Sequence, residues 1–275
     1  MSNIKSKLKA MAPAGVKKHL YMRRFKNETS GPAAGSPLAG IVETVSQQKF
    51  SADEQVAIDR IEALRERTNR DETPLVFTDF GAGAETDTRS SGEMSSGSSE
   101  TETVGEVCRT RSKPPIWAQF LFQLVRETKP QSCIEMGTCL GISASYLGAA
   151  LKLNGSGKLV TLEGAPSIAD FARGQLNSLD LDNVAVVTGQ FSDTLASTLE
   201  ALKPVDFVFV DGHHDGPATI EYFQQIRPYL SENAVMVFDD ISWSPGMRAA
   251  WEEIAREDLD AYDFTNLGVC MNIKP

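Results

Sequence analysis

From residue 114 onward, short β-branched runs alternate with amphipathic stretches, and this alternation constrains the fold more than any other feature of the chain. The runs are apolar along their whole length, which is typical of parallel strands buried on both faces. We therefore predict an α/β fold with a doubly wound, mostly parallel, Rossmann-like sheet. The expected strands are 132–136, 158–164, 183–189, 205–212 and 234–240, the expected helices 114–130, 142–153, 167–179, 193–202, 217–230 and 247–257, with 261–266 and 268–273 as a closing hairpin.

Residues 1–106 lack this alternation and are predicted to form an N-terminal extension to a domain at 107–275. Within the extension we expect a helix near 52–68. Ser51 suits its N-cap and Glu54 follows three residues later, the pattern of a capping box. The helix carries a modest apolar stripe and should pack on the main body or on a partner.

Residues 81–105 are rich in Ser and Gly and nearly free of large apolar side chains. Burial in such a segment cannot offset the entropy lost on ordering it, so we predict a flexible segment. The functional alternative is a flap that orders when a ligand binds.

Charge is unevenly distributed along the chain. Residues 1–26 hold eight of the 27 Lys and Arg residues and no acid, so the remainder has nineteen basic residues against 37 acidic ones. An acidic body of this kind argues against nucleic-acid binding, which depends on neutralising phosphates. The basic arm is expected to be a solvated, partly helical tail. It could instead lie on an anionic membrane surface, and a transit peptide is a third reading.

The sequence offers no membrane-spanning stretch and no secretory signal. The four cysteines are scattered, without the spacing of a zinc site, and are expected to be reduced thiols. We therefore expect a cytoplasmic protein, with a peripheral position at the inner membrane surface if residues 1–26 bind lipid.

Polar residues and glycines gather where the first two strands of the predicted sheet end. Glu135 closes one strand before a turn containing Gly137 and Gly141, and Glu163 closes the next. Ligands of such sheets bind beyond the carboxyl ends of the strands, and an acid there can accept both hydroxyls of a ribose. The turn lacks the G-x-G-x-x-G spacing of nicotinamide enzymes. The pattern favours an adenosine-containing ligand, and the missing spacing weakens a nicotinamide reading.

The stretches EMGTCLGIS, TLEG, TGQF, FVDGHHDG and FDDISWSP, in this order, resemble the class I S-adenosyl-L-methionine-dependent methyltransferases with their seven-stranded sheet. They are similar to the small-molecule O-methyltransferases related to catechol O-methyltransferase and to a bacterial branch with a D-G-x-H signature. The resemblance covers residues 107–275. It implies a methionine side lined by Glu135, Gly137, Thr138, Gly141 and Ser143, a ribose held by Glu163, and an adenine bordered by Gly189, Gln190 and Phe191.

Three acids are expected at the same rim, Asp211 after the fourth strand and Asp239 and Asp240 after the fifth. Three neighbouring carboxylates repel one another unless a cation or protons relieve them, and oxygen ligands suit Mg²⁺. The catechol-type enzymes carry an Asp at the first position and Asp-Asn at the second pair, so Asp240 departs from the resemblance. The sequence predicts a divalent cation at Asp211, Asp239 and Asp240. The alternative is that Asp211 contacts the cofactor, Asp239 caps a turn, and no metal binds.

His214 is the candidate general base, because it matches the histidine of the D-G-x-H signature and imidazole accepts protons near neutral pH. Asp211 is placed with it in the catalytic group, and His213 is expected to be a neighbour without a role. Trp243, Met247 and Arg248 could form a wall of the acceptor pocket, although Trp243 and Met247 suit the core equally well.

The resulting hypothesis is methyl transfer from S-adenosyl-L-methionine to a hydroxyl oxygen of a small molecule or glycan, with a metal ion assisting. A nucleotide-dependent (NAD-type) enzyme on the same fold is one rival. A non-catalytic protein that binds a ligand or partner is another. The sequence defines neither the acceptor nor the oligomeric state.

Overall fold

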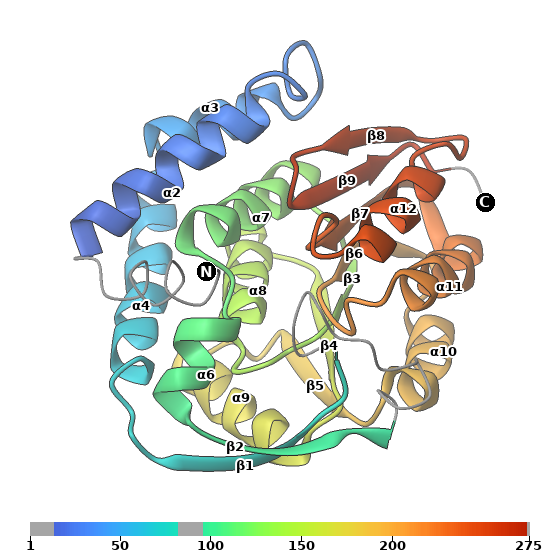
Figure 1. The fold of residues 1–275 in the computed structure, drawn as a ribbon. Coiled ribbons are helices and arrows are strands. Elements are labelled where there is room, and N and C mark those ends of the chain that lie inside the picture. The colour runs from blue at the N-terminus through green and yellow to red at the C-terminus, as the bar shows by residue number, and fades with distance from the viewer. Residues whose placement is uncertain (1–13, 82–95, 274–275) are drawn as a thin grey trace.

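The computed structural model describes residues 14–81 and 96–273, and the side chains from residue 19 onward. Its centre is a seven-stranded sheet with the order β5-β4-β3-β6-β7-β9-β8 (Figure 1). β9 is antiparallel to both of its neighbours, and the other pairs are parallel. The strands are β3 Ser132–Met136, β4 Lys158–Glu163, β5 Val184–Thr188, β6 Val205–Val210, β7 Leu230–Asp239, β8 Asp260–Asp263 and β9 Leu267–Met271.

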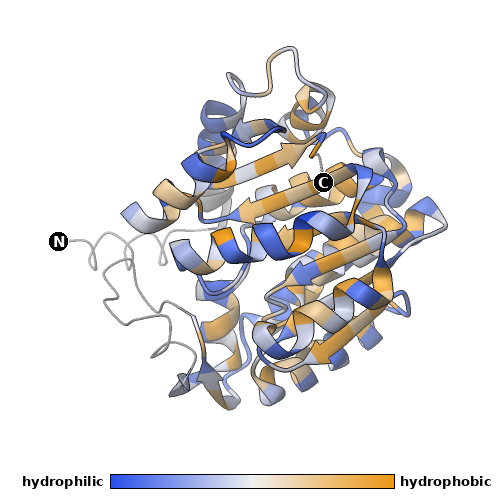
Figure 2. Ribbon diagram, turned by 90° about the vertical axis from the view of Figure 1, so that its right-hand side faces the viewer, coloured by the Kyte–Doolittle hydropathy of each residue, from blue (hydrophilic) through white to orange (hydrophobic). Residues whose placement is uncertain are grey.

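Helices cover both faces of the sheet, as the doubly wound prediction requires. One face carries α7 Pro115–Thr128, α8 Ile142–Asn154 and α9 Pro166–Ser178, and the other carries α10 Phe191–Leu202, α11 Gly216–Ile226 and α12 Pro245–Ile254. Along β6, Phe207 and Phe209 belong to the first core, whereas Val208 and Val210 belong to the second. Figure 2 shows the resulting concentration of hydrophobic residues in the strands. The α/β fold class and the closing hairpin are confirmed.

Several predicted boundaries are wrong. The strand expected over 234–240 is β7 Leu230–Asp239, and the helix expected over 247–257 is α12 Pro245–Ile254. The helix expected over 217–230 ends at Ile226, and a short 3₁₀ helix, η1 Arg227–Tyr229, leads directly into β7. Leu230, expected to be helical, pairs with Val205 at the start of β6. Pro228 interrupts the run because it has no backbone N–H to donate to the preceding turn.

The helices before residue 70 pack on the same core as the sheet. They are α2 Ala14–Thr29, α3 Ala39–Gln47 and α4 Ala52–Thr68, and they lie against α7 and α8 (Figure 1). α4 begins after Ser51 with the predicted capping box to Glu54. Near the end of α2, Phe25 is fully buried, and its ring meets Trp117 edge-on at 4.9 Å. This end of the predicted basic arm is therefore part of the hydrophobic core.

The prediction that residues 81–105 form a flexible segment is wrong for the second part of that segment. β2 Ser98–Thr103 pairs antiparallel with β1 Pro74–Asp79, and α6 Val104–Arg111 follows with a capping box between Thr103 and Glu106. β2 has no apolar side chains of its own, and pairing with β1 stabilises it instead. Arg111 adds two ion pairs, to Asp79 on β1 and to Glu102 on β2, at 2.6 Å each. Residues 82–95 of the prediction lie outside the described residues.

The division of the chain between residues 106 and 107 stays a prediction, and that position lies inside α6. Residues 1–13 of the basic arm lie outside the described residues. Within residues 14–81 and 96–273, no helix combines the length and apolar character needed to cross a bilayer.

Candidate active site

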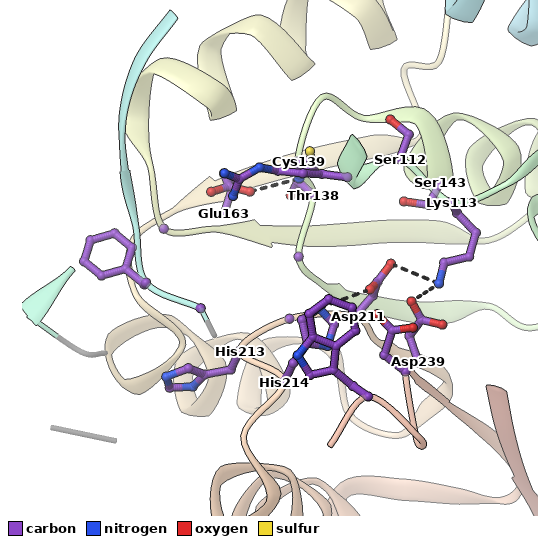
Figure 3. Close-up of a pocket in the computed structure, with 18 of the residues that line it drawn as sticks. Ser112, Lys113, Thr138, Cys139, Ser143, Glu163, Asp211, His213, His214 and Asp239 are labelled. Carbon is purple, nitrogen blue, oxygen red and sulfur yellow. Dashed lines mark hydrogen bonds and ion pairs between the residues drawn. The ribbon is translucent and has the colours of Figure 1, made fainter. Parts of the chain in front are cut away.

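A cavity of about 1120 Å³ opens where β3, β4, β6 and β7 end, at the point where the strand order reverses. Open α/β sheets bind their ligands at this switch point. Its walls come from both parts of the chain. They include residues 77–81 at the end of β1, residues 109–114 before α7, and the strand ends of the sheet. Figure 3 shows the side chains that converge there.

The turn after β3 forms one edge of the cavity. Gly137 has a φ of +105°, and a Cβ at this position would lie 2.0 Å from the carbonyl oxygen of Asp211. The neighbouring chain is held this close because the backbone N–H of Asp211 donates to the carbonyl of Met136 at 2.9 Å. Only glycine allows the chain after β3 to pass this close to the backbone at the end of β6. Thr138 and Ser143 line the cavity, and Gly141 begins α8 in a left-handed conformation.

Glu135 lies beneath the cavity rather than in its lining. Its side chain is fully buried, and Oε2 accepts a hydrogen bond from Thr161 at 2.6 Å. Thr161 is in turn 2.6 Å from the hydroxyl of Thr138, which does line the cavity. Oε1 has no hydrogen-bond partner among the described residues. Burial raises the pKa of Glu135 to about 8, so a cationic group reaching it would favour the ionised form.

Glu163 lines the cavity from the end of β4. Its Oε2 accepts the backbone N–H of Cys139 at 2.9 Å (Figure 3). Its Oε1 accepts the backbone N–H of Ala165, also at 2.9 Å. These bonds fix the carboxylate, although burial still raises its pKa. After β5, Gln190 and Phe191 also line the cavity, whereas Gly189 does not.

The three acids reach one rim, as the sequence predicts, but a lysine has joined them. Asp211, Asp239 and Asp240 all line the cavity together with Lys113. The Lys113 ammonium forms an ion pair with Asp239 Oδ2 and lies 4.0 Å from Asp211 Oδ2 (Figure 3). Burial raises the pKa of Asp211, and the positive charge of Lys113 opposes this rise.

This arrangement does not fit the predicted Mg²⁺ ligand set. A divalent cation shared by Asp211 and Asp239 would have to lie between their oxygens, and the ammonium of Lys113 lies there. The described residues also contain no cluster of three or more His, Cys, Asp or Glu side chains arranged to hold a metal. The physical reason is charge: an ammonium already relieves the repulsion that led to the metal prediction.

The two histidines diverge, and only one faces the acids. His214 Nε2 lies 4.0 Å from Asp211 Oδ1, and its ring is 5.9 Å from that of Trp243. His213 Nδ1 is 2.7 Å from the hydroxyl of Tyr222 on α11, and the two rings are stacked. Burial lowers the pKa of His213, which favours its neutral form. Of the pair, His214 has the position of a base at the rim.

The predicted acceptor wall is only partly assembled. Trp243 lines the cavity, but Met247 is buried against Thr219, whose hydroxyl lies 3.4 Å from its sulfur. Arg248 turns away to pair with Glu252 at 3.0 Å and Asp263 at 2.7 Å. Met247 is therefore a core residue, and Arg248 braces the C-terminal hairpin.

Several lining residues are absent from the sequence prediction. Three of them are Lys113, Arg111 and Phe80. They do not follow a strand of the predicted parallel sheet, so the sequence gives no reason to expect them at its edge. Phe80 packs on Gly164, where a Cβ would lie 2.8 Å from the ring. The one usable signal is the Pro114–Pro115 pair, which marks the start of α7 and hence the point where the chain meets the sheet edge.

Part of the chain is similar to known methyltransferases. Residues 134–241 match a family described as methyltransferase domain. A catechol O-methyltransferase from Niastella koreensis is 30% identical over 132 residues, which are 47% of this chain and 58% of that protein. The match thus spans less than two thirds of that relative's length.

Two solved O-methyltransferase structures share the fold. One from Bacillus cereus, in complex with SAH, is 25% identical and covers 59% of this chain and 83% of its own, with a TM-score of 0.51. TomG from Streptomyces achromogenes, involved in tomaymycin synthesis and in complex with SAM, is 26% identical and covers 60% and 82%, with a TM-score of 0.52. Residues 134–241 are thus similar to a methyltransferase domain, and the sheet and its helices share the Rossmann-like fold of these two O-methyltransferases.

Proposed function

We propose that this protein transfers a methyl group from S-adenosylmethionine to a hydroxyl oxygen of a small molecule. The observation that carries the proposal is the meeting of Gly137, Glu163 and the Asp211–His214 pair in one cavity at the switch point of the sheet. The matched methyltransferase domain and the O-methyltransferase neighbours support the same reaction.

The residues at the ends of β3 and β4 fit S-adenosylmethionine. The unpartnered Oε1 of Glu135 suits a positively charged amino group, and Thr161 and Thr138 connect this carboxylate to the cavity. Glu163 lines the cavity with its carboxylate already fixed by two backbone N–H groups, so it can accept ribose hydroxyls without reorganising. Gln190 and Phe191 would border the adenine from the end of β5.

S-adenosylmethionine, when bound, supplies a methyl group carried on a sulfonium. The chain must then orient the acceptor and remove its hydroxyl proton. Asp211 Oδ1 lies 4.0 Å from His214 Nε2, so its negative charge would stabilise the protonated form of that imidazole. In the proposed step His214 takes the acceptor proton as the oxygen–methyl bond forms and the sulfur–methyl bond breaks. His214 is partly exposed and can pass the proton on to water.

A phenolic hydroxyl is the acceptor that the lining favours. Trp117 and Trp243 both line the cavity, and aromatic walls stack well on a planar ring. The catechol O-methyltransferase relative points to the same class of acceptor. A glycan hydroxyl is the second candidate that the sequence leaves open, and its test uses sugar acceptors in place of phenols.

Calorimetric titration with S-adenosylhomocysteine and with NAD tests the cofactor. We expect saturable, one-to-one binding of the first ligand and no binding of the second. Isotope-labelled S-adenosylmethionine is then supplied with catechol and phenol panels and with sugars, and labelled products are read by mass spectrometry. NAD binding without S-adenosylhomocysteine binding would overturn the proposal in favour of a nucleotide-dependent enzyme. Ligand binding without transfer to any acceptor in a cell extract would favour the non-catalytic rival.

A cytoplasmic location, with residues 1–26 in peripheral contact with a membrane, is proposed on charge alone. Eight Lys and Arg residues without an acid would be attracted to anionic lipid. Flotation of the full chain with vesicles of anionic and of neutral lipid, at low and high salt, tests this contact.

A further inference from the structure

Lys113 is a buried cation at the acidic rim. Its side chain is only 9% exposed, its ammonium pairs with Asp239, and Asp211 Oδ2 lies 4.0 Å away. The ammonium also lies 5.9 Å from the ring centre of Phe209 on β6. Lysine is rarely buried to this extent unless its charge is matched. The two carboxylates supply that match from two adjacent strands.

The backbone of Lys113 is fixed as well. Its carbonyl oxygen accepts a hydrogen bond from Nη1 of Arg65 at 2.8 Å, and Arg65 is itself held by Glu62 at 2.8 Å. The following residue is Pro114, whose ring restricts φ, and α7 begins directly after it. A lysine anchored on α4 and at the start of α7 can reach the rim without ordering a long loop.

The rim therefore already contains the positive charge that three carboxylates need. A divalent ion entering between Asp211 and Asp239 would have to displace the ammonium, and the displaced charge would remain close to the ion. Removing one partner of a buried ion pair leaves an uncompensated charge, which opposes this exchange.

We propose that Lys113 is the resident cation of this methyltransferase site, occupying the position of a divalent metal ion, so that the protein works without one. The ammonium has three N–H donors, of which Asp239 takes one and Asp211 attracts another. A further donor can face the acceptor oxygen, because Lys113 lines the cavity. This role in the reaction rests on the proposed function, whereas the exclusion of metal does not.

Binding of Mn²⁺, followed by its electron paramagnetic resonance signal, tests the exclusion without any acceptor. We compare the full-length wild-type chain, Lys113→Met, Lys113→Gln and Lys113→Arg. Lys203→Met is the control, because Lys203 is exposed on the surface and pairs with Glu200. Lys113→Gln can still donate a hydrogen bond to Asp239, so it keeps a folded chain available if Lys113→Met does not fold.

We expect the wild type, Lys113→Arg and Lys203→Met to leave the free Mn²⁺ signal unchanged. Lys113→Met or Lys113→Gln should bind one equivalent of Mn²⁺, at least about tenfold more tightly than the wild type, because three carboxylates are then without a cation. Binding by the wild type at a similar strength would overturn the inference. So would the absence of binding by both neutral variants, provided that their S-adenosylhomocysteine affinity shows an intact fold.

Turnover in EDTA provides the second arm. Wild-type methyl transfer should be unchanged by EDTA, and the Lys113→Gln variant should lose at least about tenfold in kcat and recover part of it with added Mn²⁺. Loss of wild-type activity in EDTA, restored by Mg²⁺, would overturn the inference while leaving the proposed function intact. If no acceptor is ever methylated, the proposed function fails, and the Mn²⁺ measurement still decides the role of Lys113.

Discussion

At the residue scale, the site depends on groups whose neighbours leave them little freedom. Gly137 is held against the backbone of Asp211, Glu135 is buried with one oxygen unpartnered, and His214 faces Asp211 while its neighbour turns to Tyr222. Each of these positions has a specific physical reason, and each gives a measurable consequence.

Substituting Gly137→Ala should destabilise the protein by about 2–4 kcal/mol and weaken S-adenosylhomocysteine binding at least about tenfold. The added Cβ would lie 2.0 Å from a backbone oxygen that cannot move away without breaking the β3–β6 pairing. Gly155→Ala is the matched control, because Gly155 also has a positive φ, +75°, but nothing lies within 4 Å of its Cβ position. Urea unfolding and calorimetry measure the two effects. Equal losses in both variants would show that backbone strain, rather than the close approach, matters.

Glu135 should make the protein less stable as pH rises. Its pKa is raised by burial to about 8 in the folded state, from an ordinary value of 4.5, so the folded state binds more protons between these values. Stability then falls with pH across this window, on the order of 5 kcal/mol for a group that remains fully buried. The Glu135→Gln variant should lack this part of the dependence. Urea unfolding of both proteins from pH 5 to 9 measures the difference, and parallel curves would contradict the prediction.

His214→Asn should lower kcat by about 100-fold or more, because a base positioned for proton transfer typically contributes that much. His213→Asn is the matched control, since His213 lies next in the chain but contacts Tyr222. The kcat of the His213→Asn variant should change less than about tenfold, and the substitution should act on the free energy of unfolding instead. If His213→Asn loses more turnover than His214→Asn, the assignment of the base is wrong. The assay is single-turnover transfer with whichever acceptor the labelling screen identifies.

At the scale of elements, the short sheet of β1 and β2 forms a wall of the cavity. Arg111 at the end of α6 pairs with Asp79 on β1 and Glu102 on β2, and its guanidinium lies 5.0 Å from the ring centre of Phe77. Ser167 of α9 donates to the carbonyl of Val76 at 2.8 Å. A single side chain thus joins both strands of this wall to the segment that contains Lys113.

Arg111→Gln should loosen that wall without unfolding the chain. We expect amide hydrogen exchange in β1 and β2 to become at least about tenfold faster, with overall stability reduced by about 1 kcal/mol. Arg60→Gln is the control, because Arg60 forms an exposed ion pair with Asp180 at 3.0 Å, away from the cavity. Unchanged exchange in β1 and β2 would show that strand pairing alone holds them. Mass spectrometry of exchanged peptides resolves the two regions.

The elements that could be predicted from the sequence are those whose own pattern determines them. The apolar runs at 132–136 and 205–210 form β3 and β6, and both strands begin at the predicted residue. Ser51 caps α4, also as predicted. β2 could not be predicted, because SSETET has no apolar side chain and becomes a strand only by pairing with β1. The strand order could not be predicted either, since β9 lies between β7 and β8 through backbone pairing that leaves no trace in local sequence.

At the scale of the whole molecule, the N-terminal helices and the sheet form one continuous packing unit. Phe25 of α2, Val45 of α3 and Ile61 of α4 belong to the same buried cluster as the residues of α7 and α8. The extension therefore cannot be removed without exposing apolar surface of α7 and α8.

Phe25→Ala should lower the free energy of unfolding of the full chain by about 3 kcal/mol, because the ring is fully buried between Trp117 and Phe120. Leu20→Ala, on the same helix but 46% exposed, should change it by less than about 0.5 kcal/mol. Tryptophan fluorescence during urea unfolding follows both, and Trp117 reports directly on the contact. If Phe25→Ala unfolds like the wild type, α2 is a loosely attached arm, as its charge alone predicts.

The sequence by itself determined the fold class, the glycine turn after β3 and the acids at the strand ends, because periodicity and strand termini are local properties of the chain. Only the tertiary structure decided what surrounds those acids. Lys113 lies 98 residues before Asp211, and its ammonium reaches the rim through the packing of α4 and α7 rather than through any motif. Ion pairs between segments that are distant in the sequence form only where the folded chain brings them together. For this reason the predicted metal site is replaced by a proposed lysine site.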